Sequence, residues 1–278
     1  MTHTLYEQRD QPEGVPPLAL TGERTLPDVP EENYWFRRHL AVYEWIAARV
    51  AGERVIDMAC GEGYGSDVLA ASAASVVGVD ANPEAHEHAR LRYRRANLRF
   101  ERDLVESFAE RADAVVFLQT IEHLQDPGAV LEHYRSLVSG TGTQSGGLGP
   151  GGLGRGTVYV STPNVLTLAP KGAERSDNPW HVHEYKASEF RELCAERFGS
   201  VELYGLFHAR KLRLHEFALK AGWDAVHPRL GLTARFYGWF TPAIAASDFA
   251  LIPAVGGGAP SGEADLDRAL DFVAVCRP

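Results

Sequence analysis

A glycine-rich turn between a strand-like run and a helical pattern is the feature that most constrains this chain. In VIDMACGEGYGS (residues 55–66), glycines stand at positions 61, 63 and 65, after an apolar run that contains Asp57. Glycine lets a backbone turn sharply and approach a ligand closely, because it carries no Cβ. The amides that open the next helix then face whatever binds above the strand end. The following apolar run, VVGVD, ends in Asp80. Together these features predict a site for a nucleotide-like cofactor.

Strand-like and helical patterns alternate along most of the chain. Strands are expected at residues 55–59, 75–80, 97–102, 113–119, 157–164, 201–207 and at the C-terminus, and helices at 38–50, 66–73, 83–95, 127–138, 186–199 and 211–222. Several of the strands are apolar on both faces, as in DAVVFLQ, which is typical of a parallel sheet covered by helices on both sides. The fold class is therefore predicted to be α/β.

The same pattern suggests a division of the chain. Residues 1–37 are expected to be an extended N-terminal cover, and residues 38–207 together with 266–278 the cofactor-binding domain. Residues 208–265 are interpreted as a cap inserted before the last strand, where it could contact a substrate. The Gly-rich segment 139–156 is predicted to be a flexible loop, interpreted as a tolerated insertion, with a mobile lid as the alternative.

Composition excludes several classes of function. The formal net charge of −9 argues against a dedicated nucleic-acid binder, which usually carries a basic field. The three cysteines are far apart and form no CxxC pair, which fits a reducing cytosol and argues against a zinc cluster. Uncharged apolar runs stay shorter than the roughly 18 residues of a membrane span. We therefore expect a cytoplasmic protein with a small-molecule partner, no nucleic acid and no membrane span.

The spacing of the glycines narrows the cofactor. GEGYG is GxGxG, whereas nicotinamide and flavin folds use GxGxxG to bring a helix N-terminus onto a pyrophosphate. With Asp57 ahead of it, the loop suits a ligand with a positive ammonium and sulfonium and no phosphate. Asp80 can accept hydrogen bonds from both hydroxyls of a ribose, or alternatively cap a helix that begins near Pro83. Asp103, after the third strand, can face an adenine amino group, or alternatively cap a helix over 104–110.

A set of motifs points to a known family. DMACGEGYGS, VGVD, FLQTIEHLQDP and VSTPN, in this order, resemble class I S-adenosylmethionine-dependent methyltransferases. The flanks TGERTLP, ENYWFRRH and NPWHVHEY resemble an actinobacterial branch that methylates glucose-based glycans. The resemblance implies a Rossmann-like seven-stranded sheet with an antiparallel last strand, S-adenosylmethionine as cofactor, and a sugar hydroxyl of a glycan as acceptor. The chain departs from the family pattern at the Gly-rich loop.

The resemblance also implies which residues bind and react. Those implied to surround S-adenosylmethionine are Asp57, Ala59, Cys60, Gly61, Gly63, Asp80, Ala81, Asp103, Leu104 and Gln119. His123 is the candidate catalytic base, because a sugar hydroxyl must lose its proton and imidazole has a suitable pKa. The alternative is a structural histidine that caps the turn before Pro127.

Acceptor contacts are expected from segments outside the core. The candidate residues are Tyr34, Arg37, His181, Glu184 and His208, and Arg24 is a further candidate for binding a sugar or a carboxylate. His181, His183 and Glu184 are all possible metal ligands, but three ligands within four residues of an extended loop converge poorly, so no metal is predicted. The alternatives to a glycan methyltransferase are methylation of a quinone, polyketide or lipid, and a non-catalytic module that binds the cofactor. The chain is expected to be a monomer or a homodimer.

Overall fold

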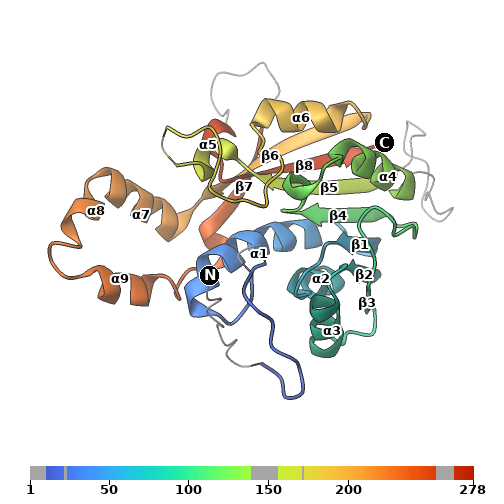
Figure 1. Ribbon diagram of the computed structural model, residues 1–278, viewed down its shortest axis with the longest axis horizontal. Coiled ribbons are helices and arrows are strands. Elements are labelled where there is room, and N and C mark those ends of the chain that lie inside the picture. Colours follow the sequence, from blue (N-terminus) through green and yellow to red (C-terminus); the bar gives the residue numbers. More distant parts are fainter. Residues whose placement is uncertain (1–10, 22–23, 139–155, 171, 255–265) are drawn as a thin grey trace.

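A computed structural model describes residues 11–21, 24–138, 156–170, 172–254 and 266–278. In the described part, a sheet of 8 strands has the order β3-β2-β1-β4-β5-β8-β6-β7 (Figure 1). Its strands are β1 (Arg54–Met58), β2 (Ser75–Val79), β3 (Leu98–Glu101), β4 (Ala114–Leu118), β5 (Thr157–Pro163), β6 (Ser200–His208), β7 (Phe249–Pro253) and β8 (Asp271–Arg277). β1 to β5 are parallel, whereas β8 is antiparallel to both β5 and β6.

Helices cover both faces of the sheet, with α1 to α3 on one side and α4 and α6 on the other (Figure 1). The α-helices are α1 (Asn33–Ala47), α2 (Tyr64–Ala70), α3 (Pro83–Arg92), α4 (Pro127–Val138), α5 (Val165–Leu168), α6 (Ala187–Ala195), α7 (Arg210–Lys220), α8 (Trp223–Val226) and α9 (Thr233–Phe240). Short 3₁₀ turns are η1 (Pro30–Glu32), η2 (Ile121–His123), η3 (Ala246–Asp248) and η4 (Leu266–Arg268). Within the described residues, each helix is too short or too polar to cross a membrane.

Side chains alternate across the strands and build one core layer on each face. In β1, Ile56 and Met58 join the buried cluster that includes Leu131 of α4 and Phe190 of α6. Val55 points the other way, into the cluster beneath α1 and α2. This is the period of two that a strand imposes, so a strand buried on both faces is mainly apolar.

The α/β fold with an antiparallel last strand is confirmed, and the sheet has one strand more than the seven expected. The extra strand, β7, pairs antiparallel with β6, with Leu251 opposite Leu206. It comes from the segment 208–265 that was interpreted as a cap. An edge strand presents unpaired N–H and C=O groups, and β7 satisfies those of β6.

Two other expectations concern the flanks of the core. The prediction that residues up to 37 are extended is wrong for 33–37, because α1 begins at Asn33. Pro30 opens η1 just before it, and the Asn33 side chain donates hydrogen bonds to the carbonyls of Thr241 and Ile244, at 2.8 and 3.0 Å, which anchors the helix start. The predicted Gly-rich loop, apart from Gly156, lies outside the described residues. The segment with α7, α8 and α9 projects from the edge of the sheet (Figure 1).

Candidate functional site

The loop between β1 and α2 turns in a way that favours glycine. Gly61 and Gly63 have φ of 56° and 97°, in the left-handed region that side chains rarely adopt. Gly65 is needed for a different reason: a Cβ there would lie 2.1 Å from the ring of Tyr43. The glycine therefore allows α1 to pass directly over the start of α2, which brings Tyr43 to the loop.

A buried carboxylate holds this loop from below. Glu62 is 1% exposed, and its Oε1 lies 2.9 Å from Nε2 of His88 on α3. Its Oε2 accepts hydrogen bonds from the hydroxyl of Tyr93, at 2.7 Å, and from the backbone N–H of Tyr64, at 3.1 Å. Buried charges are stable only when they are paired in this manner. Glu62 thus fixes the loop to α3.

Asp57 lies beneath the loop rather than on its open side. It is fully buried, and it accepts hydrogen bonds from Ser66 Oγ, at 2.6 Å, and from the Tyr43 hydroxyl, at 3.2 Å. Burial raises the pKa of this carboxyl to about 7, an effect that these two hydrogen bonds oppose. Any effect of Asp57 on a ligand therefore passes through Tyr43, which does face the cavity.

Asp80 stands at the tip of β2, where its carboxylate faces the glycine loop. Its Oδ2 accepts a hydrogen bond from the backbone N–H of Gly61, at 2.8 Å, and its Oδ1 from that of Asn82, at 2.9 Å. The alternative reading of Asp80 as a helix cap is wrong, because Asn82 caps α3 by accepting a hydrogen bond from Ala85. Asp80 is thus placed to bind a ligand next to the loop.

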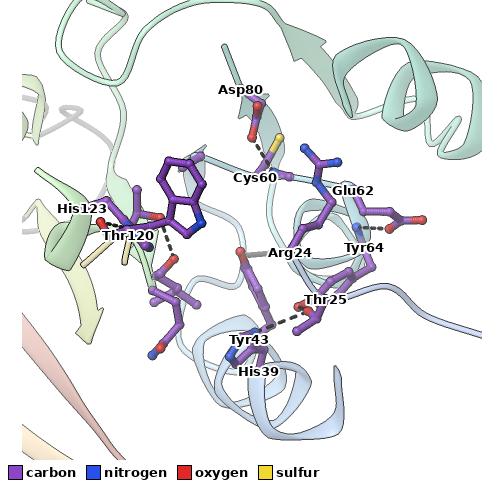
Figure 2. Close-up of a pocket in the computed structure, with 15 residues that line it drawn as sticks. Arg24, Thr25, His39, Tyr43, Cys60, Glu62, Tyr64, Asp80, Thr120 and His123 are labelled. Carbon is purple, nitrogen blue, oxygen red and sulfur yellow. Dashed lines mark hydrogen bonds between the residues drawn. The ribbon is translucent and has the colours of Figure 1, made fainter. Parts of the chain in front are cut away.

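These groups surround a cavity of about 490 Å³, a size typical of small-molecule sites. Figure 2 shows Asp80 and His123 approaching it from different strand ends, with Tyr43 and His39 rising from α1. The predicted residues that line it are Ala59, Cys60, Gly61, Asp80, Gln119, His123 and Arg24. Ala59 and Gln119 have positive φ, at 56° and 52°, so the backbone departs from extended geometry where β1 and β4 end at the cavity.

Other residues predicted for the cofactor lie outside the lining that the described residues define. They are Asp57, Gly63, Ala81, Asp103 and Leu104. Asp103 follows β3 and accepts a hydrogen bond from the backbone N–H of Leu104, at 2.8 Å. The alternative that it caps a helix is wrong, since residues 104–110, all of them described, contain a turn at 105–107 and no helix.

The sequence analysis missed several residues of the cavity wall. They are Thr25, His39, Tyr43, Glu62, Tyr64, Leu118, Thr120 and Trp180. His39 is half-buried, and desolvation lowers its pKa to about 4, so it is neutral near pH 7. His39 and Tyr43 lie one helical turn apart in α1, which is the signal that could have placed both on one face.

His123 lies in η2, directly after β4, and it borders the cavity. Its Nδ1 is 3.1 Å from the carbonyl oxygen of Trp180, and its ring centroid is 5.0 Å from that of His181. At the start of α4, Asp126 accepts the hydrogen bond from the backbone N–H of Ala129. The catalytic and the structural readings of His123 both stay predictions.

The loop that carries His181 is held against η2. The backbone N–H groups of Val182 and His183 both donate to the carbonyl oxygen of Glu122, at 2.8 and 3.1 Å. His181 Nδ1 lies 2.7 Å from Oε1 of Glu184. Burial would raise the pKa of Glu184, but hydrogen bonds, the strongest from Ser176, lower it below its usual value.

Ligand-type side chains gather here in a different grouping from the one weighed in the sequence. The metal hypothesis there concerned His181, His183 and Glu184. Among the described residues, the structure instead groups Glu122, His123 and His181, whose ligand atoms all lie within 4.8 Å of one another.

The remaining acceptor candidates lie outside the cavity lining. The Tyr34 hydroxyl is 2.8 Å from Nε2 of His208, so α1 and the end of β6 meet there. Arg37 donates to the side chain of Asn33 at 3.0 Å. The structure thus joins Tyr34 with His208, and their contact with an acceptor stays a prediction.

Comparison with known proteins agrees with this geometry. A family model described as a methyltransferase domain matches residues 32–209. A probable S-adenosylmethionine-dependent methyltransferase of Mycolicibacterium smegmatis is 37% identical and covers 93% of this chain and 94% of its own. One of Mycobacterium tuberculosis is 34% identical, covering 93% and 89%.

A solved structure supports the fold. A methyltransferase of Thermotoga maritima, described as a possible histamine N-methyltransferase, has a TM-score of 0.53 and covers 90% of this chain and 95% of its own, at 14% identity. At that identity the likeness concerns the fold alone. The matching family model and the similar mycobacterial proteins show that this chain belongs to the class I S-adenosylmethionine-dependent methyltransferases.

Proposed function

We propose that this methyltransferase methylates a sugar hydroxyl of a glucose-based glycan or oligosaccharide. The observation that carries the proposal is the pairing of His123 with Trp180 on the cavity wall. The Trp180 side chain is 65% exposed, so its indole can pack against the apolar face of a sugar ring. The imidazole beside it suits a hydroxyl that must lose a proton.

S-adenosylmethionine is proposed to bind on the other side of the cavity, at the glycine loop and Asp80. The Asp80 carboxylate, which already accepts the Gly61 amide, would hold the ribose hydroxyls. Gly61 leaves room for close backbone approach, and Arg24, whose Cγ lies over it, would pair with the carboxylate of the methionine part. Ala81, Asp103 and Leu104 are proposed to border the adenine. Support comes from their place at the carboxyl ends of β2 and β3, the edge where α/β sheets bind ligands.

The chain's residues contribute orientation and proton removal. When bound, S-adenosylmethionine supplies an electrophilic methyl carbon on a sulfonium. The cavity walls would hold the acceptor oxygen in line with that carbon. His123 assists the loss of the hydroxyl proton, either as the base itself or by binding another group that promotes deprotonation.

The acceptor side is proposed to continue beyond the cavity. Tyr34, Arg37, His181, Glu184 and His208 would flank a longer glycan, and the projecting part of the inserted segment, with α7, α8 and α9, would serve as a cap. Support comes from the contact of Tyr34 with His208, which joins α1 to the strand from which that segment departs. A cytoplasmic location is proposed because all three cysteines are free thiols, and a monomer or homodimer is proposed as the working form.

The test is methyl transfer from labelled S-adenosylmethionine to a panel of glucose oligosaccharides, simple phenols and quinols, and lipid extracts. We expect label in the oligosaccharides, released with the sugar after glycoside hydrolysis. Label confined to the phenols, quinols or lipids would contradict the glycan proposal while leaving the enzyme a methyltransferase.

A further inference from the structure

Three ligand-type side chains converge where the proposed acceptor hydroxyl would lie. The ligand atoms of Glu122, His123 and His181 all fall within 4.8 Å of one another, and His123 is also part of the cavity wall. When each ligand atom lies about 2.1 Å from an ion, two ligand atoms are at most about 4.2 Å apart. Small side-chain rotations would bring these three residues to that spacing. Two imidazoles and one carboxylate form a donor set that suits first-row divalent ions and leaves further coordination positions open.

Both histidines are held in the tautomer that a metal site requires. Nδ1 of His123 faces the carbonyl of Trp180 at 3.1 Å, and Nδ1 of His181 faces the carboxylate of Glu184 at 2.7 Å. Carbonyl and carboxylate oxygens only accept, so each Nδ1 carries the hydrogen and each Nε2 of a neutral ring carries the lone pair. A histidine that ligates a metal almost always has such an acceptor on its other nitrogen.

The third side chain is also fixed, and the two segments are joined before any ion arrives. Glu122 is 2% exposed, and one of its carboxylate oxygens accepts a hydrogen bond from Thr162 of β5, at 3.1 Å. Its backbone carbonyl accepts hydrogen bonds from Val182 and His183, which ties η2 to the loop with His181. The donor set is therefore preorganised by long-range contacts.

We propose that Glu122, His123 and His181 bind one divalent transition-metal ion, such as Mn²⁺ or Zn²⁺, and that an open position of this ion binds the acceptor hydroxyl. The inference rests on the proposed function and deepens it, because His123 then acts through the ion. A cation lowers the pKa of a bound hydroxyl, whose proton passes to water. A lone pair of the resulting oxygen anion forms the new O–CH₃ bond as the C–S bond breaks, and the sulfonium leaves as a neutral thioether.

The experiment measures metal binding directly. Untagged protein is stripped with a chelator, dialysed and titrated with Co²⁺, and the visible absorption of the bound ion is followed. We expect one equivalent to bind, with affinity at least tenfold lower in Glu122→Gln and His181→Asn. Glu184→Gln, which removes the carboxylate behind His181, should weaken binding by about 10- to 100-fold. His183→Asn, on the same loop, is the matched control and should bind Co²⁺ like the wild type.

Two further measurements separate the possible outcomes. Thermal unfolding and calorimetric binding of S-adenosylmethionine show that each variant is folded. Failure of the folded wild type to bind Co²⁺, or equal binding by all variants, overturns the metal site. Methyl transfer that persists in stripped protein also overturns it, and leaves the proposed function standing with His123 as a direct base. Specific Co²⁺ binding without methylation of any oligosaccharide supports the site and refutes the glycan acceptor.

Discussion

The two sides of the cavity are built in different ways. On the cofactor side, Gly61 and Asp80 belong to one β1–α2–β2 unit, and a hydrogen bond joins them directly. On the acceptor side, His123 and Trp180 come from segments 57 positions apart, and they meet through a hydrogen bond between η2 and a long loop. The contacts on the first side form within a short stretch of chain, whereas those on the second side form only once the sheet has assembled.

Under the proposed function, the first side binds the cofactor and the second selects and activates the acceptor. Changes on the acceptor side should lower turnover while leaving the affinity for S-adenosylmethionine intact. Changes on the cofactor side should lower that affinity or the stability of the loop. Variants on one side that lose both turnover at saturating cofactor and affinity for S-adenosylmethionine would contradict this division.

The largest effect is expected at His123. His123→Ala should lower turnover by about 100- to 10,000-fold, the usual range for loss of a group that controls proton transfer. Calorimetry should show an unchanged affinity for S-adenosylmethionine. His183→Ala, in the neighbouring loop, is the control and should keep wild-type turnover; an equal loss in both variants would indicate a general disturbance of the loop.

The next effect concerns pH and Asp57. Its pKa of about 7 in the folded protein, raised by burial from 3.8, means that the folded state binds the proton more tightly than the unfolded chain. The free energy of unfolding of the cofactor-free protein should therefore fall as pH rises from about 4 to about 7, by up to about 4 kcal/mol. Denaturant titrations of wild type and Asp57→Asn across this range should show that the variant lacks this fall. Parallel curves would mean that Asp57 is already ionised when folded.

Asp80 tests the cofactor side directly. Asp80→Ala removes the acceptor proposed for two ribose hydroxyls and should weaken S-adenosylmethionine binding by about 100-fold. Glu84→Ala, an exposed acidic residue on α3, is the control and should bind normally. If Asp80→Ala binds as tightly as wild type, the ribose assignment is incorrect.

The smallest effect is expected at Gly65. In Gly65→Ala the new methyl group would clash with the Tyr43 ring, since its position is 2.1 Å away, and should destabilise the protein by about 1–3 kcal/mol. Gly238, within α9, has nothing within 4 Å of such a Cβ. Gly238→Ala should therefore be neutral or stabilise by up to about 1 kcal/mol. Thermal unfolding of the two variants measures the contrast.

The fold, and the meeting of the glycine loop with Asp80 beside the cavity, could be predicted from sequence because their signals are local. The period of apolar residues, the glycine spacing and the acidic residue after β2 lie within short windows. β7 was not predicted, because its sequence pattern is weak and its place depends on pairing with the edge of β6. Asp57 and Gly63 were expected at the ligand, yet neither lines the cavity that the described residues define. No pattern in the sequence distinguishes the side of a tight turn that faces a cavity from the side that faces the core.

Local sequence patterns suffice to specify an α/β chain with a glycine loop and Asp80 at one sheet edge, since backbone conformation and alternating burial follow from each residue and its neighbours. The packing of α1, which brings Tyr43 and His39 to the cavity, depends on the assembled fold. The meeting of His181 with His123 and Glu122 also depends on it, through hydrogen bonds between segments far apart in the chain. Spacing along the sequence cannot encode such contacts, because they form only when the sheet brings its strand ends together.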